Sequence, residues 1–204
     1  VSATIHAAAV VDNDASIGDG ATVGPHAVIE GDVVIGDGCD IQHGAHIAAG
    51  ARLGNDVKVF PYAVVGTVPQ DLKFSGEPTT LEIGDRTVIR EFATLNRGTS
   101  ARGRTVVGAD CLLMAYTHVA HDCEVGDHCI LANAATLAGH VTLEDWVIVG
   151  GLVPVHQFVK IGCHAMIGGG WRVPKDVPPY ATAVGSPLKP VDVNKIGLER
   201  RGFN

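Results

Sequence analysis

Large aromatic rings are scarce in this sequence, because Phe, Trp and Tyr together make up only 5% of its 204 residues. Apolar residues as a whole still reach 46%, so we expect one domain whose core is built from small and β-branched side chains. Long apolar runs are also missing, since no stretch approaches the roughly 20 residues that a membrane helix requires. The sequence therefore predicts no membrane insertion.

Paired cysteines and a signal peptide are absent as well. The five cysteines are odd in number and form no Cys-x-x-Cys pair, which argues against a disulfide framework or a zinc ribbon. The first residues have neither the basic flank nor the apolar stretch of a signal peptide. These absences together predict a cytoplasmic protein.

Positive charge is in short supply overall, but not near the C-terminal end. A net charge of −7 argues against a general nucleic-acid binder. From Trp171 onward, however, six Lys and Arg residues face three acidic ones, whereas residues 1–170 carry nine basic and 19 acidic residues. A locally basic end suits an acidic partner or a phosphate group, and a solvated tail would explain the charge equally well.

The sequence does contain a six-residue repeat, or hexad. In steps of six from Ile5 to Val173, 26 of 29 positions are Ile, Leu or Val, and the exceptions are Asp71, Glu77 and Ala101. Gly often follows the aliphatic residue, and a small residue comes three positions later. The spacing of three and four that marks a helix is not seen. Each hexad therefore predicts one short strand and one turn.

Three hexads close one triangular coil, and stacked coils pair their strands in parallel. This predicts an all-β fold, a hexapeptide-repeat parallel β-helix in the form of a triangular prism. The aliphatic and the small residue point inward, and the Gly after the aliphatic residue is expected to permit the tight corner. Four cysteines fall on the small inward position and are predicted to be core residues: Cys39, Cys111, Cys123 and Cys129.

Interruptions of the repeat predict where the chain leaves the prism. Residues 66–82 contain two prolines and a polar stretch, and residues 98–106 form a second, shorter excursion. Both are expected to be loops, where function concentrates. After Val173, four prolines end the solenoid. We therefore predict a β-helix over residues 1–177 and a short extension over 178–204, with one or two helical turns near Lys195–Arg201.

Several histidines gather around one column of the prism. The third hexad position holds His121, then Gly139 and Gln157 one and two coils further on, while His118, His140 and His156 lie close to that column. Asp122 could accept a hydrogen bond from one ring nitrogen of His121 and leave the other nitrogen as a base. The backbone N–H of Gly139 would suit a developing oxyanion.

This combination predicts acyl transfer. Ser and Cys nucleophiles are missing from the strip, so we expect direct attack by a hydroxyl or amine of the substrate, without an acyl-enzyme.

At these residues the sequence resembles the bacterial UDP-N-acetylglucosamine acyltransferase family. The resemblance rests on the hexad register together with "PQDLKF", "HVAHDC", "LAGH", "VHQF" and "RRGF", and it spans nearly all of residues 1–204. It implies a homotrimer of left-handed parallel β-helices with active sites between subunits. Periodicity alone cannot give that handedness, because ordinary parallel crossovers are right-handed.

The resemblance also implies the reaction. The family transfers an (R)-3-hydroxyacyl chain from acyl carrier protein, where phosphopantetheine carries it, to the 3-hydroxyl of UDP-N-acetylglucosamine. That transfer opens lipid A biosynthesis and uses no metal or other cofactor. The carrier protein is acidic, which gives the basic end of this chain a candidate partner. The family normally continues past "RRGF" into a C-terminal helical domain, whereas this sequence stops at Asn204. We therefore expect a truncated or naturally short chain without that domain.

Roles follow from the resemblance residue by residue. His121 matches the general base, Asp122 the carboxylate that orients it, and Gly139 the oxyanion-hole amide. The residues that match the family's sugar and acyl cleft are Gln70, Asp71, Lys73, His118, His140, His156 and Gln157. Those that match its nucleotide and phosphate end are Asn194, Arg200 and Arg201. Gly168 and Gly169 lie where the family measures acyl length. Glycine there favours a longer chain, although Trp171 nearby could shorten it.

Four alternatives stay open at this point. A sugar nucleotide with a 3-amino group would serve as acceptor for the same base. The related N-acyltransferase of the same pathway shares the solenoid, but it usually carries an extra N-terminal domain. A trimeric zinc hydratase could use His118, His121 and His140 as ligands, which would leave Asp71, Lys73 and "RRGF" without a role. A non-catalytic binding solenoid is the last alternative.

Overall fold

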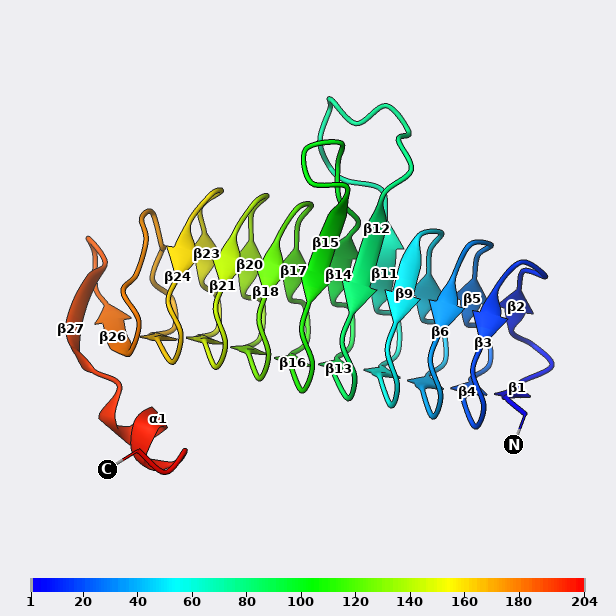
Figure 1. Ribbon diagram of the computed structural model, residues 1–204, viewed down its shortest axis with the longest axis horizontal. Coiled ribbons are helices and arrows are strands. Elements are labelled where there is room, and N and C mark those ends of the chain that lie inside the picture. Colours follow the sequence, from blue (N-terminus) through cyan, green and yellow to red (C-terminus); the bar gives the residue numbers. More distant parts are fainter. Residues whose placement is uncertain (1, 204) are drawn as a thin grey trace.

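The computed structural model describes residues 2–203, which form a long three-sided rod of stacked coils with the chain ends at opposite ends of the rod (Figure 1). Three sheets make up its sides, and most strands are only two residues long. No helix among these residues is long and apolar enough to cross a membrane. The expected all-β parallel β-helix is therefore confirmed.

The strand bounds define the three sheets, here named A, B and C. Sheet A contains β1 (Thr4–Ile5), β4 (Thr22–Val23), β7 (Asp40–Ile41), β10 (Lys58–Val59), β13 (Val88–Ile89), β16 (Leu112–Leu113), β19 (Ile130–Leu131), β22 (Ile148–Val149), β25 (Met166–Ile167), β26 (Ala181–Val184) and β27 (Lys189–Val193). Sheet B contains β2 (Val10–Val11), β5 (Val28–Ile29), β8 (His46–Ile47), β11 (Val64–Thr67), β14 (Thr94–Asn96), β17 (His118–Val119), β20 (Thr136–Leu137) and β23 (Pro154–Val155). Sheet C contains β3 (Ser16–Ile17), β6 (Val34–Ile35), β9 (Ala51–Leu53), β12 (Thr80–Ile83), β15 (Arg104–Val107), β18 (Glu124–Val125), β21 (Thr142–Leu143) and β24 (Lys160–Ile161).

The pairing register reproduces the coil of three hexads. Val10 pairs with Val28 and Thr136 with Pro154, each pair three hexads apart. Across the first excursion Val64 pairs with Thr94, five hexads on, and across the second Thr94 pairs with His118, four hexads on. The first excursion therefore inserts two whole hexads and the second inserts one. For that reason the aliphatic register resumes in phase after each of them.

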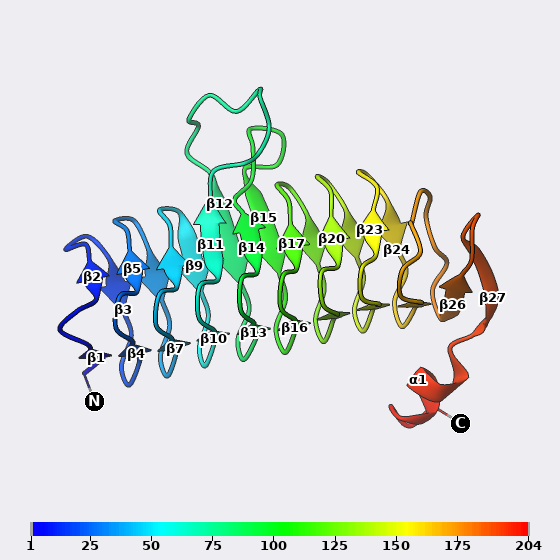
Figure 2. The same cartoon turned by 180° about the vertical axis from the view of Figure 1, so that it is seen from behind.

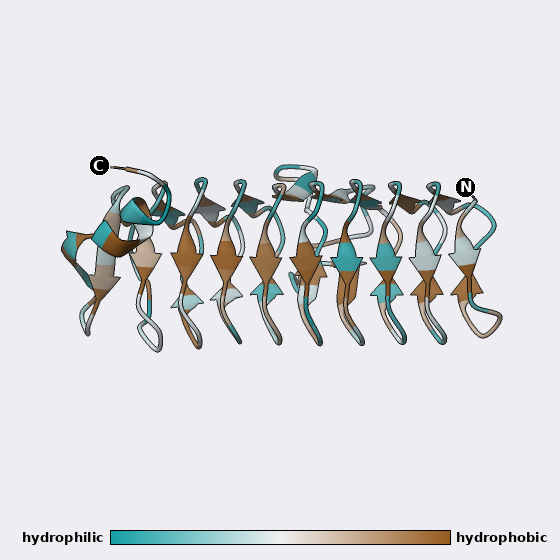
Figure 3. Cartoon of the chain, turned by 90° about the horizontal axis from the view of Figure 1, so that it is seen from below, coloured by the Kyte–Doolittle hydropathy of each residue, from teal (hydrophilic) through white to brown (hydrophobic). Residues whose placement is uncertain are grey.

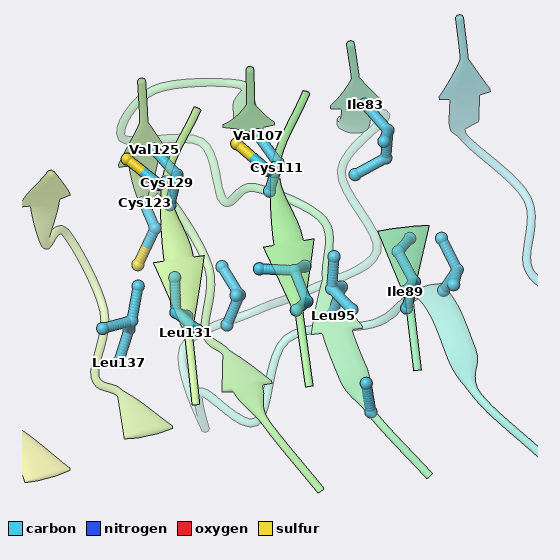
Figure 4. Packing of buried hydrophobic residues seen from close by; sticks show 14 of the residues in the cluster. Ile83, Ile89, Leu95, Val107, Cys111, Cys123, Val125, Cys129, Leu131 and Leu137 are labelled. Atoms are coloured by element: carbon cyan, nitrogen blue, oxygen red, sulfur yellow. The ribbon is translucent and has the colours of Figure 1, made fainter. Parts of the chain in front are cut away.

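The core follows the hexad pattern. The aliphatic residues point into the prism and are buried from Val23 to Val173, and the small residues between them are buried as well (Figure 4). Cys39, Cys111, Cys123 and Cys129 lie in this core as free thiols. Burial raises the pKa of Cys123 to about 12, so its thiol stays protonated. The prediction that these four cysteines are structural is confirmed.

The role expected for the glycines that follow the aliphatic residues is wrong. Except at Gly66 (φ 90°), where the first excursion begins, the left-handed backbone conformation falls two residues later, where side chains as large as Tyr62 (φ 60°) and Trp146 (φ 65°) occupy it. Gly36 instead lies against the next coil, where an added Cβ would come 2.5 Å from the Gly54 carbonyl oxygen. These glycines therefore permit close stacking of successive coils rather than the corner itself.

Both excursions leave the same edge of the prism, between sheets B and C, and project from it side by side (Figures 1 and 2). The first loop covers residues 68–79, between β11 and β12, and the second covers residues 97–103, between β14 and β15. Both are shorter than expected, because the ends of the predicted ranges 66–82 and 98–106 pair as extended strands. The turn between β17 and β18 lies on this same edge.

The C-terminal residues extend sheet A before they turn helical. β26 pairs parallel to β25 and antiparallel to β27, and the helix α1 (Lys195–Glu199) follows. Asn194 caps α1, because its Oδ1 accepts a hydrogen bond from the Gly197 N–H. The helical turn expected near Lys195–Arg201 is therefore present. Strand pairing, however, continues beyond the expected boundary at residue 177.

Candidate active site

His121 and Asp122 occupy the turn between β17 and β18, on the B–C edge next to both loops. They take the third and fourth hexad positions, and Asp122 adopts the left-handed conformation with φ 59°. This turn lets the Asp122 carboxylate fold under the inserted second loop, where it is fully buried. The His121 ring remains 17% exposed.

The two side chains form a hydrogen-bonded pair, with 2.8 Å between His121 Nδ1 and Asp122 Oδ2. An ionised carboxylate can only accept, so Nδ1 must carry the proton. In the neutral imidazole, Nε2 of His121 is then the nitrogen without a proton, and it is able to take one from a substrate. The orienting role expected of Asp122 therefore has the geometry that it requires.

Two further donors reach the Asp122 carboxylate from Thr99 in the second loop. The Thr99 backbone N–H lies 2.9 Å from Oδ1, and its hydroxyl lies 2.7 Å from Oδ2. Burial pushes the pKa of the Asp122 carboxyl upward, but the hydrogen bonds from Thr99 and His121 outweigh it and hold that pKa below its ordinary value. The carboxylate is therefore ionised at neutral pH.

The neighbouring histidines His118 and His140 are held neutral. Nε2 of His140 lies 3.7 Å from Asp122 Oδ2, and its ring meets that of His121 edge to face at 5.2 Å. Nδ1 of His118 bonds the Thr94 hydroxyl at 2.8 Å. Burial is the main cause that lowers the pKa of each of these two imidazoles. Neither therefore adds a positive charge to the site at neutral pH.

Gly139 lies directly against the His121 ring. A Cβ on Gly139 would come 2.6 Å from Cε1 and 2.8 Å from Nε2 of His121, so only glycine leaves room for the imidazole there. The Gly139 N–H makes no hydrogen bond within residues 2–203, although its carbonyl accepts one from Phe158. The expected stacking is thus observed, with a free N–H beside the basic nitrogen.

The first loop brings Asp71 and Lys73 to the same edge. Asp71 Oδ1 accepts a hydrogen bond from the Lys73 N–H at 3.0 Å, which shapes the loop, while the side chains of Gln70 and Lys73 are exposed. Glu77 joins this loop to the second one, because its Oε1 accepts from the Ser100 N–H at 3.1 Å. Ser100 is the neighbour of Thr99, so the two loops and the His121–Asp122 pair form one connected unit.

Two residues of this unit were missed in the sequence. Thr99 belongs to the inserted hexad and so has no repeat position to mark it. Arg97 holds the third hexad position one coil before His121, a signal that the register does contain. Its Nη1 donates to the Ala49 carbonyl, and its guanidinium lies 5.5 Å from the Phe74 ring of the first loop.

The remaining expected site residues lie elsewhere on the rod. His156 and Gln157 are exposed on the B–C edge, one coil beyond Gly139. Gly168 and Gly169 follow β25 on the A–B edge, where a Cβ on Gly168 would meet Val184 at 2.6 Å and Trp171 at 3.4 Å. Within one chain these glycines are not brought next to His121.

Of the residues expected at the phosphate end, Asn194 and Arg201 lie on the C–A edge, and Arg200 lines a pocket over sheet A with Ile148 and Met166. Arg201 packs over the Trp146 ring at 4.9 Å and contacts Nδ1 of His164 at 3.1 Å. Asn194 is buried as the cap of α1, and Arg200 is exposed. A single chain therefore separates these residues from His121, so one site can contain both sets only where two copies of the chain meet.

Among residues 2–203, one group offers three close metal-ligand atoms, and it consists of His121, Asp122 and His140. In the structure, however, these atoms are engaged in hydrogen bonds. Asp122 accepts three hydrogen bonds through its two oxygens, and Nδ1 of His121 faces the carboxylate rather than an open position. A catalytic zinc needs ligands that converge on it and a free site, so the group fits a base and its orienting carboxylate better than a metal centre. His118 is not part of the group.

Comparisons with known proteins agree with this geometry. The chain matches the family model of bacterial transferase hexapeptide repeats over residues 14–49 and 104–139. Residues 176–204 match the model described as domain 2 of UDP-N-acetylglucosamine O-acyltransferase. The repeat is therefore the one expected from the aliphatic register.

Named relatives cover nearly the whole chain. An acyl-[acyl-carrier-protein]–UDP-N-acetylglucosamine O-acyltransferase of Verminephrobacter eiseniae is 56% identical over 98% of this chain and 76% of its own length. The enzyme of the same name from Herminiimonas arsenicoxydans is 47% identical over 98% of this chain and 77% of its own length. This chain thus spans about three quarters of those relatives.

Solved structures agree in fold. A UDP-N-acetylglucosamine acyltransferase from Francisella novicida superposes with a TM-score of 0.97 at 40% identity, over 98% of this chain and 74% of that one. The corresponding protein from Bacteroides fragilis gives a TM-score of 0.95 at 45% identity, over 98% and 78%. The fold of this chain is accordingly the left-handed parallel β-helix that the resemblance implied.

Proposed function

Because this chain belongs to the UDP-N-acetylglucosamine O-acyltransferase family, we propose that it transfers an acyl chain from acyl carrier protein to UDP-N-acetylglucosamine. The acyl group is an (R)-3-hydroxyacyl chain and the acceptor is the sugar 3-hydroxyl, so the product enters lipid A biosynthesis. The observation that carries this proposal is the His121–Asp122 pair, whose unprotonated Nε2 lies beside the unused N–H of Gly139.

Each of these groups has a defined role in the reaction. His121 Nε2 removes the proton from the sugar 3-hydroxyl as its oxygen attacks the thioester carbonyl. The Gly139 N–H donates a hydrogen bond to the oxyanion that develops on that carbonyl. Asp122 keeps the imidazole in its tautomer and stabilises the imidazolium. The imidazolium then returns the proton to the departing phosphopantetheine thiolate, which completes the transfer without a metal or other cofactor.

The other site residues bind the two substrates. Asp71, Lys73 and the adjacent Gln70 contact the sugar from the first loop, while His118, His140, His156 and Gln157 line the cleft along the B–C edge. Asn194, Arg200 and Arg201 serve the nucleotide and phosphate end, and Gly168 and Gly169 limit the acyl chain. Since these last two sets lie on other edges of the prism, the complete site forms between subunits of a homotrimer.

An apolar surface on sheet A supports such an assembly. Seen from below, the strands of sheet A change from partly hydrophilic at β7 and β10 to hydrophobic from β13 to β25 (Figure 3). The first residue of each of these strands is the less buried one, and it changes from Asp40 and Lys58 to an apolar residue in every later strand: Val88, Leu112, Ile130, Ile148 and Met166. A contiguous apolar strip of this kind is typical of a surface that another chain covers. A cytoplasmic location belongs to the same proposal, because all five cysteines are unpaired, as is usual in a reducing compartment.

The experiment that tests this function is transfer from (R)-3-hydroxyacyl carrier protein to UDP-N-acetylglucosamine with a chelator present. Wild type should turn over, and His121→Ala should lose about 10²- to 10⁴-fold in kcat, the usual contribution of a general base. Its thermal unfolding should match that of wild type, because the ring lies outside the aliphatic core. His6→Ala, which changes an exposed histidine of the first coil, is the matched control.

Two results would contradict the proposal. Full activity of His121→Ala would show that His121 is not the general base. Loss of wild-type activity on chelation would indicate a metal enzyme. Turnover only with the 3-amino sugar nucleotide would change the acceptor from a hydroxyl to an amine and leave the role of His121 in place.

A further inference from the structure

The Asp122 carboxylate is held by a threonine that the repeat does not supply. Thr99 lies in the hexad inserted between β14 and β15, and its side chain is buried with only 7% exposure. Both of its donors, the backbone N–H and the hydroxyl, end on Asp122. We infer that Thr99 is a positioning residue of the general base, acting through Asp122 to set the direction and strength of the His121–Asp122 hydrogen bond. This inference rests on the proposed function.

The hydroxyl of Thr99 has one available direction. Its oxygen accepts a hydrogen bond from the Ala101 N–H at 3.2 Å, so the O–H proton points away from that donor toward Asp122 Oδ2, 2.7 Å distant. The Thr99 N–H meanwhile holds the other oxygen, Oδ1, at 2.9 Å. Because the two donors of Thr99 each hold a different oxygen of Asp122, they fix the plane of the carboxylate. Oδ2 is thereby aimed at Nδ1 of His121.

The backbone of Asp122 is fixed from the other side of the same loop. Its N–H donates to the Thr105 hydroxyl at 2.8 Å, just where the second loop rejoins β15. The loop itself closes through the Gly103 N–H, which donates to the Thr99 carbonyl at 2.7 Å. The inserted hexad therefore forms a small closed clamp around the carboxylate rather than a free excursion.

The clamp also tunes charge. Oδ2 of Asp122 shares its negative charge between the Thr99 hydroxyl and the imidazole of His121, with the neutral His140 at 3.7 Å. The charges of Arg102 and Asp71 act on His140, and the neutral His118 interacts electrostatically with His121. Without the hydroxyl, more of that charge would face His121 and would stabilise its protonated form. A larger share of the base would then be protonated at a given pH, and its ring would be less firmly aligned.

The test compares Thr99→Val, which removes the hydroxyl, with Thr99→Ser, which keeps it. Thr99→Val should lower kcat by about 10- to 100-fold, the scale of a misaligned catalytic group. It should also move the acid limb of the kcat/KM profile to higher pH by about half a unit or more. The KM for UDP-N-acetylglucosamine should change little, and Thr99→Ser should recover most of both effects.

Thr87→Val provides the matched control. Thr87 is also a buried threonine, and its hydroxyl donates to the Gly108 carbonyl and accepts from the Cys111 N–H, on the C–A edge away from His121. Its loss should lower thermal stability without moving the pH profile. A purely structural role of Thr99 would give this same pattern, so an unshifted profile in Thr99→Val, or a loss that Thr99→Ser fails to recover, overturns the inference.

A readout without turnover separates this inference from the proposed function. The ¹⁵N resonances of the His121 ring, assigned by comparison with His121→Ala, can be titrated in wild type and in Thr99→Val. A higher titration midpoint in the variant supports the role of Thr99, and an unchanged one refutes it. Absence of acyl transfer in wild type would refute the proposed function alone.

Discussion

At the scale of single residues, Gly139 shows how one missing side chain can serve another residue. Its φ lies outside the left-handed region, so alanine would not strain the backbone. The space for a Cβ is instead taken by the His121 ring, at 2.6 Å. The glycine therefore matters because of what stacks on it, in addition to the N–H that it offers.

Gly139→Ala should consequently impair catalysis far more than folding. The methyl group would push the imidazole aside by about 1 Å, and a displacement of that size costs roughly 100-fold in rate. Steady-state kinetics and a thermal melt of the variant would measure both effects. Gly31→Ala is the control, because Gly31 holds the same hexad position on the same edge and its Cβ would meet only the exposed Asp12 carboxylate, at 3.3 Å. Equal activity of the two variants would contradict the steric argument.

The sequence predicts which site residues lie next to one another only for residues that hold a position in the hexad repeat. His121, Gly139 and Gln157 share a hexad position, so their stacking follows from counting three hexads at a time. Thr99 could not be found in that way, because an inserted hexad has no partner one coil away to align with. Its contact with Asp122 depends on how the loop folds back, and spacing does not encode that path.

At the scale of elements, the two loops are best understood as inserted hexads. The three failures of the aliphatic register, Asp71, Glu77 and Ala101, are the three positions that the two insertions contribute. Both insertions follow a strand of sheet B, as does the turn that carries His121. The register therefore contains enough information to assign both loops to the edge of the active site, although not their internal contacts.

Glu77 joins these loops through its hydrogen bond from Ser100, alongside the contact of Arg97 with Phe74, and its removal should loosen the first loop. Hydrogen bonds from backbone N–H groups, its own and that of Ser75 first, hold the pKa of Glu77 below its ordinary value, so it accepts as a carboxylate at neutral pH. Glu77→Ala frees the N–H groups of Ser75 and Ser100. We expect the KM for UDP-N-acetylglucosamine to rise about two- to tenfold, as for the loss of one such bond, with kcat nearly kept.

Glu82→Ala is the control for that measurement. Glu82 lies on β12 at the end of the same loop, but its carboxylate contacts Arg104 and Thr80 on the outer face of sheet C. Its removal should leave KM unchanged. An unaltered KM in Glu77→Ala would mean that the first loop holds its shape without this contact.

At the scale of the whole molecule, each coil pairs only with its neighbours, so stability is a sum of similar local contributions. Deletion of one whole coil should therefore be tolerated where a deletion of broken hexads is not. Removing residues 18–35, which are three hexads, joins Ile17 to Gly36 and keeps every strand on its own sheet. Removing residues 18–32 breaks the hexad register, and residues 1–17 can then no longer pair with the coil that follows.

Limited proteolysis would distinguish the two deletions. The segment before the junction, residues 1–17, should resist cleavage after the whole-coil deletion, as in wild type, and should be cut quickly after the shorter deletion. Acyl transfer should survive the whole-coil deletion, because the B–C edge keeps its loops and His121. Equal sensitivity of the two variants would show that the N-terminal coils do not depend on the register.

Some features of the whole molecule can likewise be predicted from the sequence, and others cannot. The prism, its core and its coil of three hexads follow from the aliphatic register alone, since each short strand must bury one side chain per hexad. Handedness does not follow, because the same period fits either hand. The packing of Arg201 on Trp146 could not be predicted from the sequence either, because β26 and β27 lie between the repeat and Arg201 and do not follow the hexad register.

The stacking of coils along one axis also has a mechanical meaning. The hydrogen bonds between successive coils run along the rod, and the chain ends lie at its opposite ends (Figure 1). A pull between the ends would load these bonds end on, so that coils would peel away one after another rather than shear together. At roughly 3.3 Å per extended residue, an ordinary coil would release about 60 Å of chain. The two coils that carry the catalytic loops would release about 100 Å and about 80 Å, marking the position of the active site along the rod as a change in step length.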